Sequence, residues 1–260
     1  MFKQQGGFWL YFFGIIIMFL VIFYIAETLM GKQPGASLFK PKAQVTAAPS
    51  ITKVSSTGTA QQTSLPSTTS TVAVDYYGVI KTNKGEIKIE LYEKNAPNTV
   101  SNFINLANSD YYNDTKFFKL IPGFVLQGGS KTNTNVGGPG YTIPDETNWD
   151  SLDYEEDLRI VLRQEGYRSI RKLASIPLDK YVLSMVGVRP NTAGSQFYVV
   201  LANKNDNRLL ELRGRSTVFA KVIEGQQIID MIGASSVDNS LGYASPVEDL
   251  IIQDINIFVR

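Results

Sequence analysis

The chain has 260 residues, of which 43% are hydrophobic, so it is long enough to form one or two packed domains. Its 25 Lys and Arg against 24 Asp and Glu leave a formal charge of +1, which argues against a nucleic-acid-binding protein, because such a domain is usually strongly basic. The counts of Cys and His are both 0, which excludes disulfide frameworks, Cys/His zinc sites, Ser-His-Asp triads and Cys nucleophiles. We therefore expect neither a cofactor nor a metal ion.

The N-terminal region is strongly apolar. No charged residue occurs in residues 4–26, and a helix needs roughly 20 apolar residues to cross the hydrocarbon core of a membrane. We predict a short tail over residues 1–7 and a transmembrane helix over residues 8–27. A cleaved signal peptide and a buried core helix are the alternatives. A signal peptide normally has a shorter apolar segment, of about 7–15 residues, followed by a small-x-small cleavage site, and residues 25–28 offer no such site.

The orientation of this helix follows from two opposing arguments. Lys3 precedes the helix while Lys32, Lys40 and Lys42 follow it, and a count of positive charges would place the C-terminal side in the cytoplasm. Large domains nonetheless cross the membrane largely regardless of their charge. We expect a single-pass membrane protein whose globular part is extracytoplasmic.

The segment over residues 28–74 differs in composition from both of its neighbours. It is rich in Ser, Thr, Ala and Pro, and it has no acidic residue between Glu27 and Asp75. Such a segment buries too little apolar surface to offset its conformational entropy. We predict a disordered linker that acts as a tether.

Residues 75–260 show the pattern of a globular domain. A hairpin is predicted around Asn83-Lys84-Gly85, because Ile87, Ile89 and Leu91 alternate with polar residues. Helices are predicted over Pro97–Asn108, which begins with proline, and directly after Gly225. The predicted strands are short and numerous: 76–81, 86–92, 117–120, 124–127, 182–185, 197–201, 217–222 and 250–259. This pattern predicts a mainly β domain, a closed antiparallel β-barrel capped by two helices.

A helical insertion is predicted over about residues 151–180. Its acidic residues come first and its basic residues last, an order that suits the helix dipole, and Gly166 is expected to divide it into two short helices. Its apolar side chains either dock a partner protein or pack the insertion onto the barrel. These side chains are Leu158, Val161, Leu162, Ile170 and Leu173.

Two other motifs are interpreted as structural. The run 137–140 (GGPG) lacks the helix start of a dinucleotide site and is interpreted as a tight turn. The acidic run 155–157 could bind a hard cation, but adjacent residues on a helix point in different directions, so a solvated helix face is the preferred interpretation.

Five ordered blocks of sequence carry a resemblance to a known family. The runs FFKLIPGFVLQGG (117–129) and RPNTAGSQFYVV (189–200) resemble the two signature strands of the cyclophilins. The runs 84–107, 137–146 and 217–225 extend the resemblance over nearly all of residues 80–260 except the insertion. It implies a cyclophilin-like barrel with peptidyl-prolyl cis-trans isomerase activity, acting on proline-containing polypeptides.

The resemblance also implies a set of site residues. Lys119 stands at the position of the family's catalytic arginine. The other implied residues bind substrate. The pocket floor consists of Phe124, Val125, Tyr198 and Leu212. Gln127 and Gln196 are the peptide-binding glutamines, the peptide lies along the backbone of Val186 and Gly187, and Ser216 stands where a pocket histidine is common. Ordinary barrel core is the alternative interpretation of Phe124, Val125 and Tyr198.

Departures from the family pattern bear on activity. Lys119 keeps a positive charge but lacks the rigid planar fork of arginine. Phe118 and Ser216 replace histidines, and the family's pocket-wall tryptophan has no counterpart near residues 210–212. Two functions therefore remain open. One is an isomerase that assists protein folding near the membrane. The other is a catalytically weak or inactive peptide-binding module that acts as a chaperone or scaffold.

Overall fold

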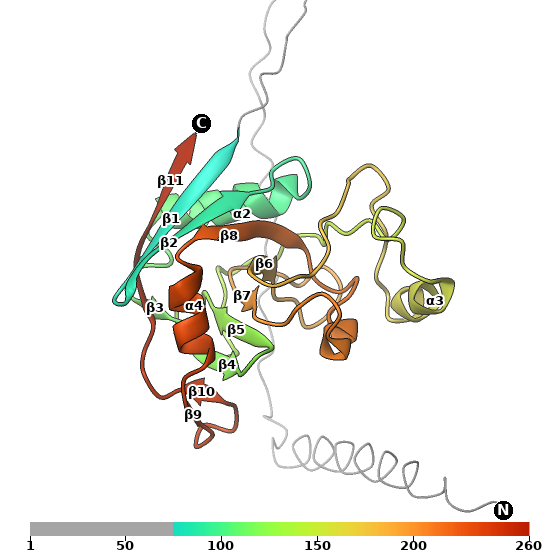
Figure 1. Ribbon diagram of the computed structural model, residues 1–260. Coiled ribbons are helices and arrows are strands. Elements are labelled where there is room, and N and C mark those ends of the chain that lie inside the picture. The colour runs from blue at the N-terminus through green and yellow to red at the C-terminus, as the bar shows by residue number, and fades with distance from the viewer. Residues whose placement is uncertain (1–74, 260) are drawn as a thin grey trace, which may run out of the picture. The chain divides into compact units, whose positions relative to one another are not determined.

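The computed structural model describes residues 75–259 (Figure 1). The predicted tail, transmembrane helix and linker, residues 1–7, 8–27 and 28–74, lie outside the described residues. Within the described part of the chain, no helix combines the length and apolar character that crossing a membrane requires.

A curled antiparallel sheet of nine strands forms the body of the domain (Figure 1). Its strands follow in the order β3-β11-β1-β2-β8-β6-β7-β5-β4. Their bounds are β1 Tyr76–Thr82, β2 Gly85–Leu91, β3 Thr115–Lys116, β4 Lys119–Ile121, β5 Val125–Gly128, β6 Val182–Met185, β7 Phe197–Val200, β8 Val218–Glu224 and β11 Ile251–Val259. A second sheet pairs β9 (Val237–Asp238) with β10 (Ser245–Pro246).

The closed barrel that we expected is present only as this curled sheet. The ladder ends at β3 on one side and at β4 on the other. A single isolated bridge between Lys116 and Ser130 joins β3 to the chain just beyond β5. The predicted strand over 117–120 accordingly begins later, at Lys119.

The first hairpin confirms the prediction from alternation. β1 and β2 pair from Tyr76 opposite Leu91 to Thr82 opposite Gly85. Ile87, Ile89 and Leu91 are buried, while the residues between them are not. Gly85 closes the turn with φ +128°, a backbone conformation that residues with a Cβ atom rarely adopt.

Two helices pack against the sheet, as predicted. α2 (Pro97–Asn108) contacts β11 and β8, and α4 (Gln226–Gly233) contacts β2. Phe103 of α2 lies in the main core, with its ring centroid 5.1 Å from that of Phe219 and 5.8 Å from that of Phe197. The N-terminus of α2 is capped by the buried carboxylate of Glu146, which accepts hydrogen bonds from the backbone N–H groups of Asn98 (3.0 Å) and Thr99 (2.8 Å).

The insertion is helical over only part of its length. α3 (Glu156–Gln164) forms, and Gly166 follows it with φ +93°, but the second helix that we predicted after Gly166 is absent. The chain beyond Gly166 instead pairs with the preceding stem, where the Ile170 N–H donates to the Thr147 carbonyl at 2.8 Å. The Asn148 side chain also donates to the Leu173 carbonyl at 2.6 Å. These bonds to the stem take the place of those that a second helix would make, which overrides the helix propensity of the segment.

Candidate functional site

A cavity of about 260 Å³ lies on one face of the sheet, over β4, β5, β7 and β6. We call it the Lys119 cavity. Nine of the ten predicted site residues line it, although they come from five separate segments of the chain. They are Lys119, Phe124, Val125, Gln127, Val186, Gly187, Tyr198, Leu212 and Ser216.

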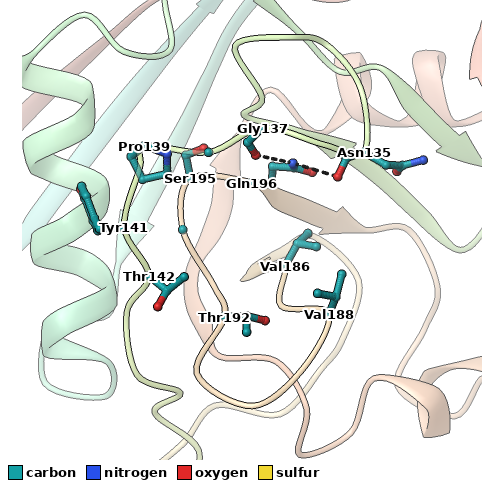
Figure 2. A pocket seen from close by; sticks show the side chains of 12 residues that line it. Asn135, Gly137, Pro139, Tyr141, Thr142, Val186, Val188, Thr192, Ser195 and Gln196 are labelled. Carbon is teal, nitrogen blue, oxygen red and sulfur yellow. Dashed lines mark hydrogen bonds between the residues drawn. The ribbon is translucent and has the colours of Figure 1, made fainter. Parts of the chain in front are cut away.

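The tenth predicted residue, Gln196, lies beside this cavity and is hydrogen-bonded to the lining residue Gln127. The Gln127 side-chain amide donates to the Gln196 side-chain oxygen at 2.9 Å, and both residues are buried. The Gln196 amide in turn donates to the carbonyls of Gly137 (2.9 Å) and Asn135 (3.3 Å). Figure 2 shows this side chain directed at both carbonyls.

Gln196 lines a second cavity of about 250 Å³, which we call the Gln196 cavity (Figure 2). Val186 and Val188 line both cavities, so the two adjoin. The run 137–140, interpreted from sequence as a tight turn, forms part of the wall, and Gly137 has φ +105°. Residues 137–139 of this run therefore shape a surface beside the predicted site.

The floor of the Lys119 cavity is apolar and belongs to a packed core. Val125 and Tyr198 are buried, and Phe124 and Leu212 are half-buried, in a hydrophobic cluster separate from the main one. Phe124, Val125 and Tyr198 therefore belong to a packed core and also line the cavity. That they bind substrate stays a prediction. A proline ring placed here would contact side chains that packing already holds fixed.

One polar pair interrupts this floor. The Tyr198 hydroxyl hydrogen-bonds the Ser216 hydroxyl, at the position where the family commonly has histidine. Burial raises the pKa of Tyr198 to about 12, although the hydroxyls of Ser216 and Ser184 oppose the shift. The phenol therefore stays neutral at physiological pH and adds no charge to the floor.

Lys119 supplies a cation at the edge of the cavity. It lies on β4 opposite Gln127 of β5, which fixes its backbone beside the glutamine pair. Its side chain is half-buried, and within residues 75–259 its ammonium makes no ion pair or hydrogen bond. The ammonium is thus available to a bound molecule.

The sequence analysis did not assign six of the residues that line the cavity. They are Ile121, Tyr167, Met185, Val188, Glu211 and Arg215. Tyr167 belongs to the insertion, and Arg215 immediately precedes the predicted Ser216. The Arg215 guanidinium forms a two-point ion pair with Glu165, with Nε 2.7 Å from Oε2 and Nη2 2.8 Å from Oε1. Hydrogen bonding from Arg215 lowers the pKa of Glu165 below its ordinary value. The adjacency of Arg215 to Ser216 was a usable signal, whereas nothing local marks Tyr167.

The family departures find distinct places. Phe118 is buried, with its ring edge-on to that of Tyr243 at 6.2 Å between centroids, and it does not line the Lys119 cavity. Trp149 is buried with Leu162 and Tyr167 in a small cluster inside the insertion. The tryptophan of the globular part therefore does not replace the missing wall directly, but it packs beside Tyr167, which does line the cavity.

The remaining predictions about the insertion have mixed outcomes. Leu162 is buried and Leu158 partly buried in the small cluster, so both pack within the insertion, and Leu162 also approaches Gly214 in the rest of the domain. Val161 and Ile170 are 41% and 38% exposed, and a partner protein at this surface stays a prediction. Glu156 of the acidic run pairs with Arg163, and residues 75–259 contain no cluster of acidic side chains suited to a metal ion.

Comparison with known proteins gives consistent matches. The cyclophilin type peptidyl-prolyl cis-trans isomerase/CLD family matches residues 77–257. A peptidyl-prolyl cis-trans isomerase of Helicobacter pylori is 34% identical over 171 residues, which are 65% of this chain and 87% of that protein. Peptidyl-prolyl cis-trans isomerase A of Mycobacterium tuberculosis is 30% identical over 196 residues, covering 68% and 90%. Peptidyl-prolyl cis-trans isomerase-like 2 of Cryptococcus neoformans is 34% identical over 181 residues, 70% of this chain but only 27% of the fungal protein.

Solved structures agree with these matches. The crystal structure of a Cryptosporidium parvum cyclophilin type peptidyl-prolyl cis-trans isomerase superposes with a TM-score of 0.54 and 30% identity, over 71% of this chain and 98% of that one. A second structure of that protein was determined in the presence of the dipeptide Ala-Pro. It also gives a TM-score of 0.54, with 31% identity over 70% of this chain and 98% of that one.

Proposed function

The chain belongs to the cyclophilin-type peptidyl-prolyl cis-trans isomerase family, and from this premise we propose that it binds proline-containing polypeptides in the Lys119 cavity and accelerates rotation about their X-Pro bonds. The single observation that carries the proposal is the cavity itself. Nine residues expected from five distant segments line one hollow, and the Lys119 ammonium among them makes no ion pair within residues 75–259.

The chemistry asked of this site is modest. Rotation about an X-Pro bond has a barrier of roughly 20 kcal/mol, because the amide is resonance-stabilised. As the bond twists, the prolyl nitrogen loses conjugation and becomes a better hydrogen-bond acceptor. A donor that meets this nitrogen only in the twisted state lowers the barrier without a nucleophile or a metal ion.

Each part of the site has a role in this scheme. The proline ring enters the apolar floor of Phe124, Val125 and Leu212, which excludes water from the amide. Gln127, held by Gln196, fixes the substrate backbone. The Lys119 ammonium donates to the prolyl nitrogen of the twisted amide. The Ala-Pro dipeptide present with the Cryptosporidium parvum protein supports a proline-containing ligand for this chain as well.

We also propose a location for the activity. If residues 8–27 form the transmembrane helix and residues 28–74 the tether, the domain acts on proteins close to the membrane, on its extracytoplasmic side. The apolar run over residues 8–25 and the lack of acidic residues in the tether support this proposal. Protease added to intact cells should release the domain, whereas protection until the cells are lysed would reverse the orientation.

A non-catalytic peptide-binding module is the second candidate, and the replacement of arginine by Lys119 favours it, because a lysine ammonium is mobile and strongly hydrated. An exchange NMR experiment separates the two. The full-length chain in mild detergent is mixed with a set of X-Pro peptides, and cis/trans exchange rates and chemical-shift perturbations are measured together. Faster exchange supports the isomerase. Shift perturbations without faster exchange support the binding module, and neither effect with any peptide would refute both.

A further inference from the structure

The insertion is built against the candidate site and does not extend freely into solvent. Its two stems are joined where Ser151 Oγ accepts a hydrogen bond from the Ser175 N–H at 2.9 Å and the Asn148 N–H donates to Ser175 Oγ at 2.7 Å. Trp149, Leu162 and Tyr167 pack together above these stems. The insertion therefore has a fixed base and a small core of its own, which define the position of Tyr167.

This core presses directly on the loop that precedes β8 and carries Leu212, Arg215 and Ser216. Gly214 in that loop has φ +75°, and a Cβ at this position would overlap the side chain of Leu162. A residue with a Cβ would be strained in this backbone conformation and would force the Leu162 side chain to move. α3 and this loop of the Lys119 cavity are thus in direct contact.

An ion pair adds a polar connection between the same two segments. Glu165 follows α3, and its carboxylate accepts two hydrogen bonds from the guanidinium of Arg215, one of 2.7 Å and one of 2.8 Å. The side chain of Arg215 is only 22% exposed. Its Nη1 also donates weakly to the Leu210 carbonyl at 3.4 Å. A guanidinium has five N–H donors, so two remain for a bound molecule.

The position of Arg215 relative to Lys119 follows from the order of the strands. Lys119 lies on β4 at the end of the sheet, whereas Arg215 lies three residues before β8. The strands β6, β7 and β5 lie between β8 and β4. The two cations therefore approach the cavity from opposite sides of its floor. Glu211 is the carboxylate among the lining residues, and it is exposed.

We propose that the insertion completes the substrate site. Tyr167 and the Glu165-anchored Arg215 form the wall that faces Lys119, and Arg215 selects peptides with an acidic side chain directly after the proline. The inference extends the proposed function and depends on peptide binding in the Lys119 cavity. A planar guanidinium held in place by one carboxylate is suited to bind a second one through its remaining donors, whereas a basic side chain has no acceptor for those donors.

The test uses the full-length chain and three peptides that differ only in the residue after proline: Glu, Gln or Lys. Dissociation constants come from NMR titration of each. We expect the Glu peptide to bind roughly 10-fold more tightly than the Lys peptide, the factor that one charge-assisted hydrogen bond provides. Arg215→Met should bring this ratio close to one, and Glu165→Gln should reduce it in part. Arg213→Met, which changes a neighbouring arginine that does not line the cavity, should leave it unchanged.

Tyr167→Leu separates contact with substrate from packing. It should weaken binding of all three peptides by a similar factor, because it changes the wall without removing the charge. An unchanged Glu/Lys ratio in Arg215→Met, or equal binding of the three peptides by the unmodified chain, would overturn the inference while the proposed function stands. Failure of the unmodified chain to bind any of them would overturn the proposed function itself.

Discussion

Replacing Lys119 by alanine tests whether its ammonium takes part in the proposed mechanism. Loss of one preorganised transition-state donor costs about 10²–10³ in rate, or ~2.7–4 kcal/mol. Lys119 is half-buried and makes no ion pair within residues 75–259, so its ammonium moves on a flexible stem and its effect should lie at the lower end. We therefore expect Lys119→Ala to lower the catalysed exchange rate about 100-fold, equivalent to about 2.7 kcal/mol.

The matched measurements are exchange NMR of one X-Pro peptide with the full-length chain and its variants. Lys81→Ala removes an exposed lysine from β1 and should leave the rate unchanged. Lys119→Arg should raise the rate by roughly 3–10-fold, because a planar guanidinium loses less freedom when it binds the prolyl nitrogen. If Lys119→Ala exchanged the peptide as fast as the unmodified chain, the cation would have no part in the reaction and the mechanism would fail.

Three further predictions concern stability and charge. Tyr198→Phe should lower the free energy of unfolding in urea by about 1 kcal/mol through loss of the hydrogen bond to Ser216. Adding Ser216→Ala to this variant should lower the free energy of unfolding little further. Fully additive losses in the double variant would contradict a shared hydrogen bond. Glu146→Gln should lower the free energy of unfolding by roughly 3 kcal/mol in the same assay, because its carboxylate accepts hydrogen bonds from two backbone N–H groups at the start of α2. A loss near zero would show that α2 does not need this cap. The pKa of Glu165 is lowered from 4.5 by Arg215, so its ion pair should be complete above that pH and be lost as the pH falls through the lower folded value; a carboxyl carbon titration with a midpoint at or above 4.5 would contradict the pairing.

The elements that sequence predicted well are those specified by local pattern. The hairpin of β1 and β2 follows from alternation around a two-residue turn, and α2 follows from an initial proline and an apolar face. In both, the residues that decide the structure lie within a few positions of one another. Short-range periodicity is then sufficient.

The errors arose where distant contacts override local preference. Residues after Gly166 have a composition compatible with helix, yet their N–H groups and carbonyls bond the stem at Thr147 and Asn148. The closure of the sheet was likewise beyond local pattern, since it depends on how β3 pairs with distant parts of the chain. A single isolated bridge, Lys116 to Ser130, joins β3 to the chain just beyond β5.

The sequence by itself determined the exclusion of Cys and His chemistry, the family, and nine residues of one cavity, because each of these is written in composition or in contiguous blocks. Only the tertiary structure decided what completes that cavity. Glu165 and Arg215 are 50 positions apart, and Tyr167 has no local signal of its place. Their meeting depends on how the insertion packs Leu162 against Gly214, and packing between segments so far apart leaves no periodic trace in the chain.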